Sequence, residues 1–341
     1  MPGLALLFAL FALRSCEGAA NSALRALPCP DPEDIYPCVC TVDPENHMTM
    51  DCSHVASEDE LARVFSSNLP FTKFHLLMIN GNQNLRVLRE GDLGPASFEI
   101  IRIMFSVLEE VQDGALAGSY TTADAIVLID NPLSVWPFHE LPLFTSLSLL
   151  ELYGGALIAI PALRSGSLQK ILLGYNQIDG IAADCFHGLE NILHIDVHGN
   201  NIETILPETF ATLPLLSYVS LLGNSLGSIH RGAIALSSTR DGIVDLHLNA
   251  ISSIEIDAIT GLNAGQLRLA GNSLSVLEEE VFRPILEGGA VVTLSDNPLR
   301  CGCDVAWLVT DPALLGLARE ATCSDGEALE NLDPSIFEDL C

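Results

Sequence analysis

Positively charged side chains are scarce in this chain of 341 residues. Lys and Arg number 15 against 44 Asp and Glu, which gives a formal net charge of −29 at pH 7. Binding to nucleic acid or to an anionic membrane surface depends on clustered cationic side chains. The sequence therefore argues against both and favours a basic or neutral partner, although acidity also serves simply to keep a protein in solution.

Motifs of catalysis and of glycosylation are missing as well. No G-x-x-x-x-G-K loop and no G-x-G-x-x-G after a strand offers a cradle for phosphate. No Gly-x-Ser-x-Gly forms a strand-to-helix elbow for a nucleophile. No Asn-x-Ser/Thr sequon occurs, so N-glycans would not shield any face. We expect a protein that is not an enzyme and that binds no cofactor.

The start of the chain predicts export. An apolar run over residues 4–13 is followed by small residues, which is typical of a secretory signal peptide, here assigned to residues 1–20. The later apolar stretch over residues 141–163 is interrupted by two prolines and two glycines, so it predicts no membrane span. We expect a secreted, extracellular protein without a membrane partner.

Cysteine is concentrated at the two ends of the chain. In a secreted protein such clusters predict disulfides, and two four-cysteine zinc sites are disfavoured because the C-x2-C knuckle is lacking. Spacing alone leaves three pairings open within each cluster. Cys185 lies among the repeats and is expected to be a buried, inert thiol. The clusters, assigned to caps over residues 21–73 and 300–341, are Cys29, Cys38, Cys40 and Cys52, and Cys301, Cys303, Cys323 and Cys341.

A repeat fills residues 74–299. In the stretch 192–205, apolar residues fall at relative positions 1, 4, 6, 11 and 14 with an Asn at position 9, and this frame recurs about every two dozen residues. The spacing is that of the leucine-rich repeat. Because side chains alternate along a strand, Ile195 and Val197 point into a core while Asp196 and His198 point outward. The Asn amide can satisfy backbone groups that a tight inward turn leaves unpaired.

The frame can be laid over ten coils, so we predict an α/β leucine-rich repeat solenoid, or horseshoe, with a parallel concave β-sheet and a disulfide-bonded cap at each end. Every coil carries an aliphatic pair at positions 4 and 6. The Asn column has gaps at Ser106 and Gly155, where coils two and four are expected to be irregular. A second apolar column, which includes Phe186 and Phe210, should fill the convex side. The coils begin at Phe74, Phe98, Ala123, Leu147, Leu168, Ile192, Leu216, Asp241, Ala264 and Gly289.

Several outward positions of coils two to seven are apolar or aromatic, although a face that met only water would be polar. We expect this face to bind a protein partner, with the alternative that an N-terminal segment or an irregular coil covers it. Two outward histidines complete the predicted site. Its residues are Met104, Phe105, Val127, Ile129, Tyr153, Leu172, Tyr175, His198, Leu222 and His247, and Leu149 belongs to the same stripe.

The same two histidines are the first candidates for a metal site. They occupy the same relative position in coils six and eight, so one strand separates them and they stand about 9.5 Å apart. A single zinc ion with bonds of about 2 Å would not reach both. We therefore predict no metal site here and interpret these residues as solvated polar groups.

Four segments resemble an arthropod group of secreted leucine-rich repeat proteins, whose namesake is the non-catalytic subunit of oplophorus-luciferin 2-monooxygenase. They are Pro28–Cys40, Phe65–Phe71, Asn80–Leu85 and Asn297–Leu308, and the resemblance covers essentially the whole mature chain. It implies a non-enzymatic scaffold that holds or stabilises a partner such as a small luciferase subunit. An extracellular recognition or adhesion module that binds a protein or a glycan is the alternative.

The resemblance also implies a disulfide pattern. Within the caps of such proteins the first cysteine pairs with the third and the second with the fourth. Carried over to this chain, the bonds would be Cys29–Cys40, Cys38–Cys52, Cys301–Cys323 and Cys303–Cys341.

Overall fold

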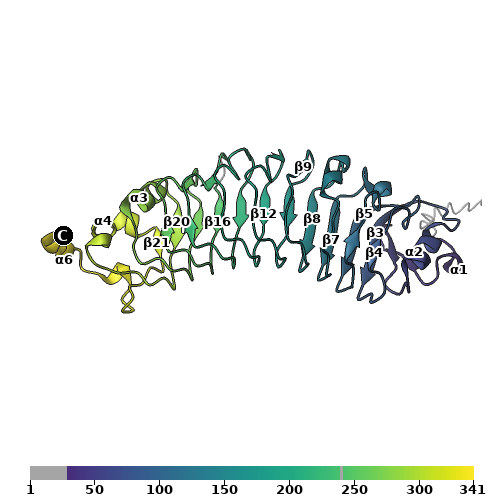
Figure 1. The fold of residues 1–341 in the computed structure, drawn as a ribbon, viewed down its shortest axis with the longest axis horizontal. Helices are drawn as coiled ribbons and strands as arrows, with labels where there is room; N and C mark the ends of the chain where they lie inside the picture. The colour runs from purple at the N-terminus through teal and green to yellow at the C-terminus, as the bar shows by residue number, and fades with distance from the viewer. Residues whose placement is uncertain (1–28, 239–240) are drawn as a thin grey trace, which may run out of the picture.

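The computed structural model describes residues 29–238 and 241–341. The predicted signal peptide, residues 1–20, lies outside the described residues. Successive coils stack side by side into an elongated, gently arched solenoid with the two caps at opposite ends (Figure 1). The predicted leucine-rich repeat fold is confirmed.

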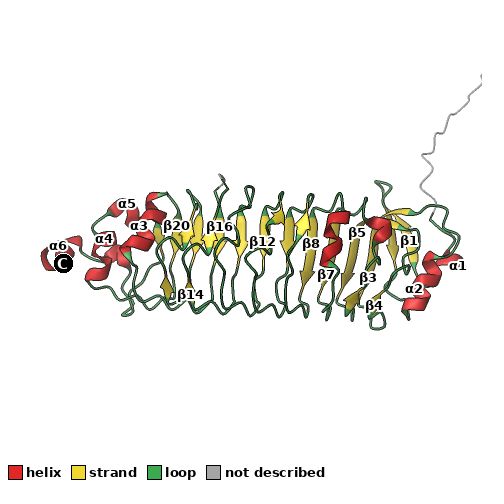
Figure 2. Cartoon of the chain, turned by 45° about the horizontal axis from the view of Figure 1, so that its top comes forward, coloured by secondary structure: helices red, strands yellow, loops and turns green. Residues whose placement is uncertain are grey.

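One sheet runs the length of the molecule (Figure 2). Its neighbours pair in parallel from β2 onward, and β1 and β2 form an antiparallel hairpin at the start. Strands of both caps extend the sheet beyond the ten predicted coils. Its thirteen strands are β1 (Val39–Val42), β2 (Met48–Asp51), β3 (Lys73–Asn80), β5 (Ser97–Met104), β7 (Ala125–Ile129), β8 (Leu149–Tyr153), β10 (Lys170–Leu172), β12 (His194–Asp196), β13 (Tyr218–Ser220), β16 (Ile243–Asp245), β19 (Gln266–Arg268), β20 (Val291–Thr293) and β21 (Ala318–Arg319).

The opposite side of the coils consists of turns, short strand pairs and a few helices. The strand pairs are β4 (Val87–Leu88) with β6 (Glu110–Val111), β9 (Arg164–Ser165) with β11 (Gly188–Leu189), β14 (Ser228–Ile229) with β17 (Ser253–Ile254), and β15 (Ile234–Ala235) with β18 (Ile259–Thr260). The helices, caps included, are α1 (Pro32–Ile35), α2 (Glu58–Phe65), η1 (Ala117–Ser119), η2 (Phe138–Leu143), α3 (Glu279–Glu287), η3 (Cys303–Val305), α4 (Ala306–Val309), α5 (Pro312–Leu315), η4 (Leu329–Asn331) and α6 (Pro334–Leu340).

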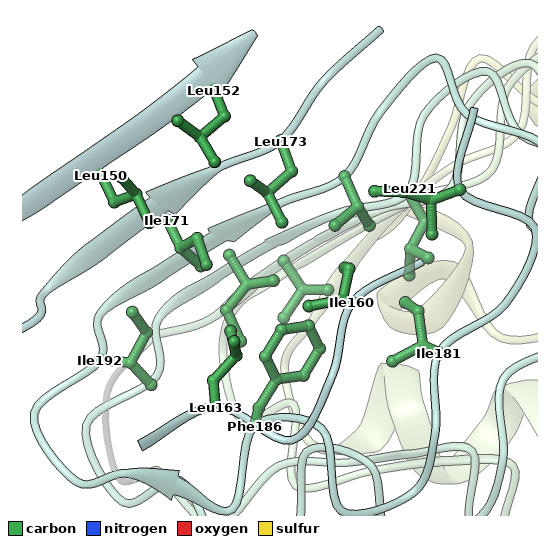
Figure 3. Close-up of a cluster of buried hydrophobic side chains, with 14 of the residues drawn as sticks. Leu150, Leu152, Ile160, Leu163, Ile171, Leu173, Ile181, Phe186, Ile192 and Leu221 are labelled. Atoms are coloured by element: carbon green, nitrogen blue, oxygen red, sulfur yellow. The ribbon is translucent and has the colours of Figure 1, made fainter. Parts of the chain in front are cut away.

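The core lies between the sheet and this outer wall. Both aliphatic residues at positions 4 and 6 are buried in all ten coils. Figure 3 shows Leu150, Leu152 and Ile171 on the strand side, with Phe186 and Leu163 across from them. The rings of Phe186 and Phe210 stack with centroids 5.9 Å apart. The predicted convex column therefore fills the interior, and burial of these apolar surfaces is the main force that holds successive coils together.

The Asn column forms a ladder of hydrogen bonds between coils. Asn200 Nδ2 donates to the carbonyl oxygens of Leu173 and Val197 at 3.0 and 2.9 Å, and its Oδ1 accepts from Ile178 N at 3.0 Å. At the first gap the Ser106 hydroxyl accepts from Asn82 N at 3.0 Å, so a shorter polar group still makes a side-chain hydrogen bond between the coils. Coils two and four keep their strands in register despite the gaps.

Every coil leaves its strand through a residue with a left-handed backbone. At position 8, φ lies between 51° and 68° in all ten coils. Glycine adopts this conformation freely, whereas a residue with a Cβ adopts it at an energetic cost. The position is occupied by Gly81, Phe105, Asp130, Gly154, Tyr175, Gly199, Gly223, Leu248, Gly271 and Asp296.

Disulfides close both caps with the pairing that the resemblance implied. The bonds are Cys29–Cys40, Cys38–Cys52, Cys301–Cys323 and Cys303–Cys341. At the C-terminal cap, Trp307 Nε1 donates to Leu277 O at 3.1 Å, which fixes the cap to the last coils. Cys185 is a free, buried thiol, as predicted. Each cap covers the apolar end of a stack that has no further coil to bury it.

Candidate functional site on the concave face

The predicted partner residues lie along the outer surface of the sheet, from coil two to coil eight. Phe105 and Tyr175 are each 55% exposed. Val127 differs from the expectation, because it is only 8% exposed and offers little surface to a partner. It lies in register between Arg102 and Glu151, whose longer side chains flank it on the neighbouring strands. The remaining predicted residues are half-buried: Met104, Ile129, Tyr153, Leu172, His198, Leu222 and His247.

Three aromatic rings from three successive coils meet on this face. The ring centroids of Tyr153 and Tyr175 are 5.3 Å apart, those of Tyr175 and His198 are 4.8 Å apart, and those of Tyr153 and His198 are 5.7 Å apart. The planes of Tyr153 and Tyr175 are inclined by 69° and those of Tyr175 and His198 by 84°, which is the edge-to-face geometry that aromatic pairs prefer, and the third pair is tilted by 50°. We call Tyr153, Tyr175 and His198 the ring cluster.

Two glycines make room for the ring cluster. A Cβ at Gly174 would lie 2.5 Å from the His198 ring, and a Cβ at Gly199 would lie 2.9 Å from the Tyr175 ring. Real Cβ atoms do not approach other atoms so closely, so a side chain at either position would displace a ring. The rings therefore lie flat over backbone that carries no side chain, and the cluster depends on these two glycines.

Three bulky side chains occupy the left-handed position that glycine or aspartate fills in the other coils. Phe105, Tyr175 and Leu248 have φ of 51°, 52° and 52°, and Leu248 is 65% exposed. A residue with a Cβ in this region carries strain on the order of 1–2 kcal/mol. Because these side chains are exposed, their burial offsets little of the strain energy. Sequence reasoning missed Leu248. Its occurrence at position 8, the position of Phe105 and Tyr175 in their coils, could have identified it.

Charge on the face is organised around His198. Its Nδ1 lies 2.7 Å from Asp196 Oδ1, and both side chains are largely buried. The hydrogen bond to Asp196 raises the pKa of His198, although burial acts against it. Burial works to raise the pKa of Asp196, but hydrogen bonds from the His198 ring and backbone outweigh it and lower that pKa. The pair therefore holds opposite charges at mildly acidic pH.

A second carboxylate of the face, that of Glu151, forms no salt bridge among the described residues. Burial raises the pKa of Glu151, Arg102 partly offsets the rise, and Asp196 adds to it. Among the described residues, Glu151 has no salt-bridge partner within 4.0 Å, whereas Asp245 pairs with both His247 and Arg268. The surface beside the ring cluster is thus locally acidic and suited to a positively charged group.

The motifs of this region that could suggest catalysis have structural partners in the repeats. The literal Gly-x-Ser-x-Gly match, Gly223 to Gly227, lies in a repeat turn where Asn224 serves the ladder by donating to Val197 O and Leu221 O. His198 and His247 each pair with the aspartate two residues earlier, not with one another. Over residues 29–238 and 241–341, no helix is long and apolar enough to cross a membrane.

Comparison with known sequences finds leucine-rich repeat proteins. A family model described as leucine rich repeat matches residues 166–226. The chain is 37% identical over 321 residues to the Oplophorus-luciferin 2-monooxygenase non-catalytic subunit of Oplophorus gracilirostris, with 93% of this chain and 89% of that protein covered. It is 27% identical over 186 residues to the CD180 antigen of Homo sapiens. That match covers 51% of this chain and 27% of the CD180 antigen.

Solved structures share the fold. A chain of the octameric complex of latrophilin 3, Unc5D and FLRT2 superposes with a TM-score of 0.68 at 22% identity, covering 86% of this chain and 91% of that one. A chain of the Toll–Spatzle complex of Drosophila superposes with a TM-score of 0.60 at 18% identity, covering 86% of this chain and 49% of that one. At such identities the likeness concerns the architecture alone.

Proposed function

The chain belongs to the family of leucine-rich repeat proteins that includes the Oplophorus-luciferin 2-monooxygenase non-catalytic subunit, and from this premise we propose that it is a secreted, non-catalytic scaffold subunit. In this role it binds and stabilises a protein partner on its concave face, and a small luciferase subunit is the partner that the relative's name suggests. The relative is 37% identical over nearly the whole chain, which supports a shared role better than a shared fold would.

One observation carries the placement of the partner on the concave face. Phe105, Tyr175 and Leu248 are large, exposed and held in a strained backbone at the same position of three coils. Strain of this kind persists where function benefits from it. A backbone that is already held in one conformation loses little entropy on binding, so large exposed side chains at these positions are suited to be interface anchors.

The electrostatics of the face support a partner with positive charge. The ring cluster stands beside Glu151 and the Asp196–His198 pair, and the whole chain carries a formal charge of −29. A Lys or Arg side chain placed against Tyr153 and Tyr175 would gain from the aromatic faces and from Glu151 together. The partner surface is therefore basic with an apolar surround.

The test begins with the native secreted protein. It is purified and its stoichiometric companions are identified by mass spectrometry, and binding is then measured with the double variant Tyr153→Asp, Tyr175→Asp. We expect thermal unfolding to change little and affinity to fall by about 2 kcal/mol or more per hot residue, roughly thirtyfold each. The matched control is Glu203→Lys with Glu208→Lys on exposed positions away from the sheet, which should change neither quantity.

Two outcomes would contradict the proposal. A double Tyr variant that melts normally and binds with wild-type affinity removes the concave face as the site. A protein that copurifies with nothing and shows only weak, ligand-specific binding is a recognition module instead. The chain by itself should also emit no light with an imidazopyrazinone luciferin, and robust emission from recombinant protein free of other chains would refute the non-catalytic role.

A further inference from the structure

A second polar cluster lies outside the concave face, where the loops of coils two and three run side by side. It combines Asp113, which follows β6, with His139 and Glu140 of η2. Their candidate ligand atoms all lie within 4.8 Å of one another. His139 Nε2 and Asp113 Oδ1 are 3.5 Å apart. Asp113 thus meets two side chains that lie 26 and 27 residues later in the sequence, and the three converge on one small volume.

A backbone hydrogen bond fixes the cluster. Gly114 N donates to Glu140 Oε1 at 2.7 Å, so the residue after Asp113 is tied directly to the carboxylate from the next coil. The left-handed φ of 70° at Gly114 is one that glycine adopts without strain. The three ligands are therefore positioned by the stacking of the coils before any ion arrives.

Glu140 supplies the observation that points to a ligand. The residue is only 7% exposed, and its Oε2 is buried without a hydrogen-bond partner. Burial contributes most to the raised pKa of the neighbouring Tyr120 phenol, and its side-chain interaction with Glu140 contributes next. No donor meets Oε2 in hydrogen-bonding geometry among the described residues. A buried carboxylate oxygen left unpaired is costly, and a cation would satisfy it.

We propose that Asp113, His139 and Glu140 form a binding site for a divalent transition metal ion, with zinc as the ion that fits best. One imidazole nitrogen and two carboxylate oxygens are a ligand set that zinc accepts, and three protein ligands leave a fourth position for water. Tetrahedral bonds of about 2.0–2.1 Å place neighbouring ligand atoms about 3.3 Å apart, close to the 3.5 Å between His139 and Asp113.

Competing ions and other sites fit less well. Calcium takes six to eight oxygen ligands, which a histidine-containing trio does not supply. Elsewhere in the described chain, His230 pairs with Glu255 at 3.0 Å, but that contact offers two candidate ligands rather than three. Asp113 and His139 have side chains 75% and 68% exposed, so an ion can enter from solvent while Glu140 closes the site from within.

The test uses the full oxidised chain without an affinity tag, treated with a chelator that is then removed. Zinc chloride is titrated by calorimetry, and cobalt absorption reports the coordination geometry. We expect one zinc ion per chain, a higher melting temperature with zinc, and tetrahedral cobalt bands. His139→Ala and Asp113→Asn should each weaken zinc binding by about 100-fold or more, since losing even an outer partner typically costs 10–100-fold.

The matched control is His230→Ala, which removes an exposed histidine of a carboxylate pair and should leave zinc affinity unchanged. Asp113 and His139 lie on the surface, so their variants remain folded even if Glu140→Gln does not. Zinc binding that is absent, or that survives His139→Ala, would overturn the site. A melting temperature raised equally by calcium, with octahedral cobalt bands, would overturn the assignment to a transition metal.

Discussion

Replacing Tyr175 with glycine separates the two roles that the structure gives this residue. The glycine removes the Cβ that is strained at φ of 52°, which returns about 1–2 kcal/mol. Against this stand the greater chain entropy of glycine, about 0.5–1 kcal/mol, and the two lost ring contacts, with Tyr153 and with His198, about 0.5–1.5 kcal/mol each. Because the side chain is 55% exposed, little buried area is lost, and stability should fall by about 1 kcal/mol.

Partner binding should respond differently. Without the ring, affinity should fall by about 2 kcal/mol or more, roughly thirtyfold. Tyr175→Ala should bind as weakly but should be less stable than Tyr175→Gly by about 1 kcal/mol, because alanine keeps the strained Cβ. Asp296→Gly is the control, since it removes a Cβ at the same turn, with φ of 56°, far from the rings.

Denaturant unfolding measures the stabilities and calorimetry or surface binding measures the affinities. If Tyr175→Gly loses more than about 3 kcal/mol of stability, the turn does not store strain as argued and the ring contributes to folding. If both Tyr175 variants bind like wild type, the ring does not touch the partner. Either result would remove the central support for a binding site on this face.

Three further predictions concern the scaffold. Asn200→Ala should cost about 3–5 kcal/mol in denaturant unfolding because it leaves buried backbone groups unpaired, whereas exposed Asn201→Ala should cost little. Burial raises the pKa of Cys185 to about 12, so maleimide should not react with it at pH 8 until the protein unfolds. The pKa of His198 is raised above 6.5 in the folded protein. Its pairing with Asp196 therefore stabilises the fold fully below about pH 6.5, and this stabilisation is lost as the pH rises through the folded-state pKa. Melting curves of His198→Gln should therefore show a larger loss at pH 6 than at pH 9, and an equal loss would argue against the pair.

The repeat frame made the core predictable. Positions 4 and 6 could be assigned in all ten coils because a strand alternates its faces over two residues, and such short-range periodicity is written directly in the sequence. The Asn ladder followed for the same reason. The cap disulfides needed a resemblance in addition, since spacing leaves three pairings open for each cap.

The candidate site was predictable only in outline. Sequence placed Tyr153, Tyr175 and His198 on one face, but it did not reveal that the three rings meet. It also counted Val127 as accessible, although the neighbouring strands leave it 8% exposed. Leu248 was missed because its importance depends on backbone conformation, which hydrophobic periodicity does not report.

The sequence by itself determined the coil, its buried side chains, its column of Asn residues and the chemical character of its surface, because each can be read from residue positions within one repeat. Tertiary structure alone decided which side chains of different coils come together. The ring cluster joins three successive coils, and the meeting of Asp113 with His139 and Glu140 joins two, so both follow from the stacking of coils. The binding surfaces belong to the stack and not to any single repeat.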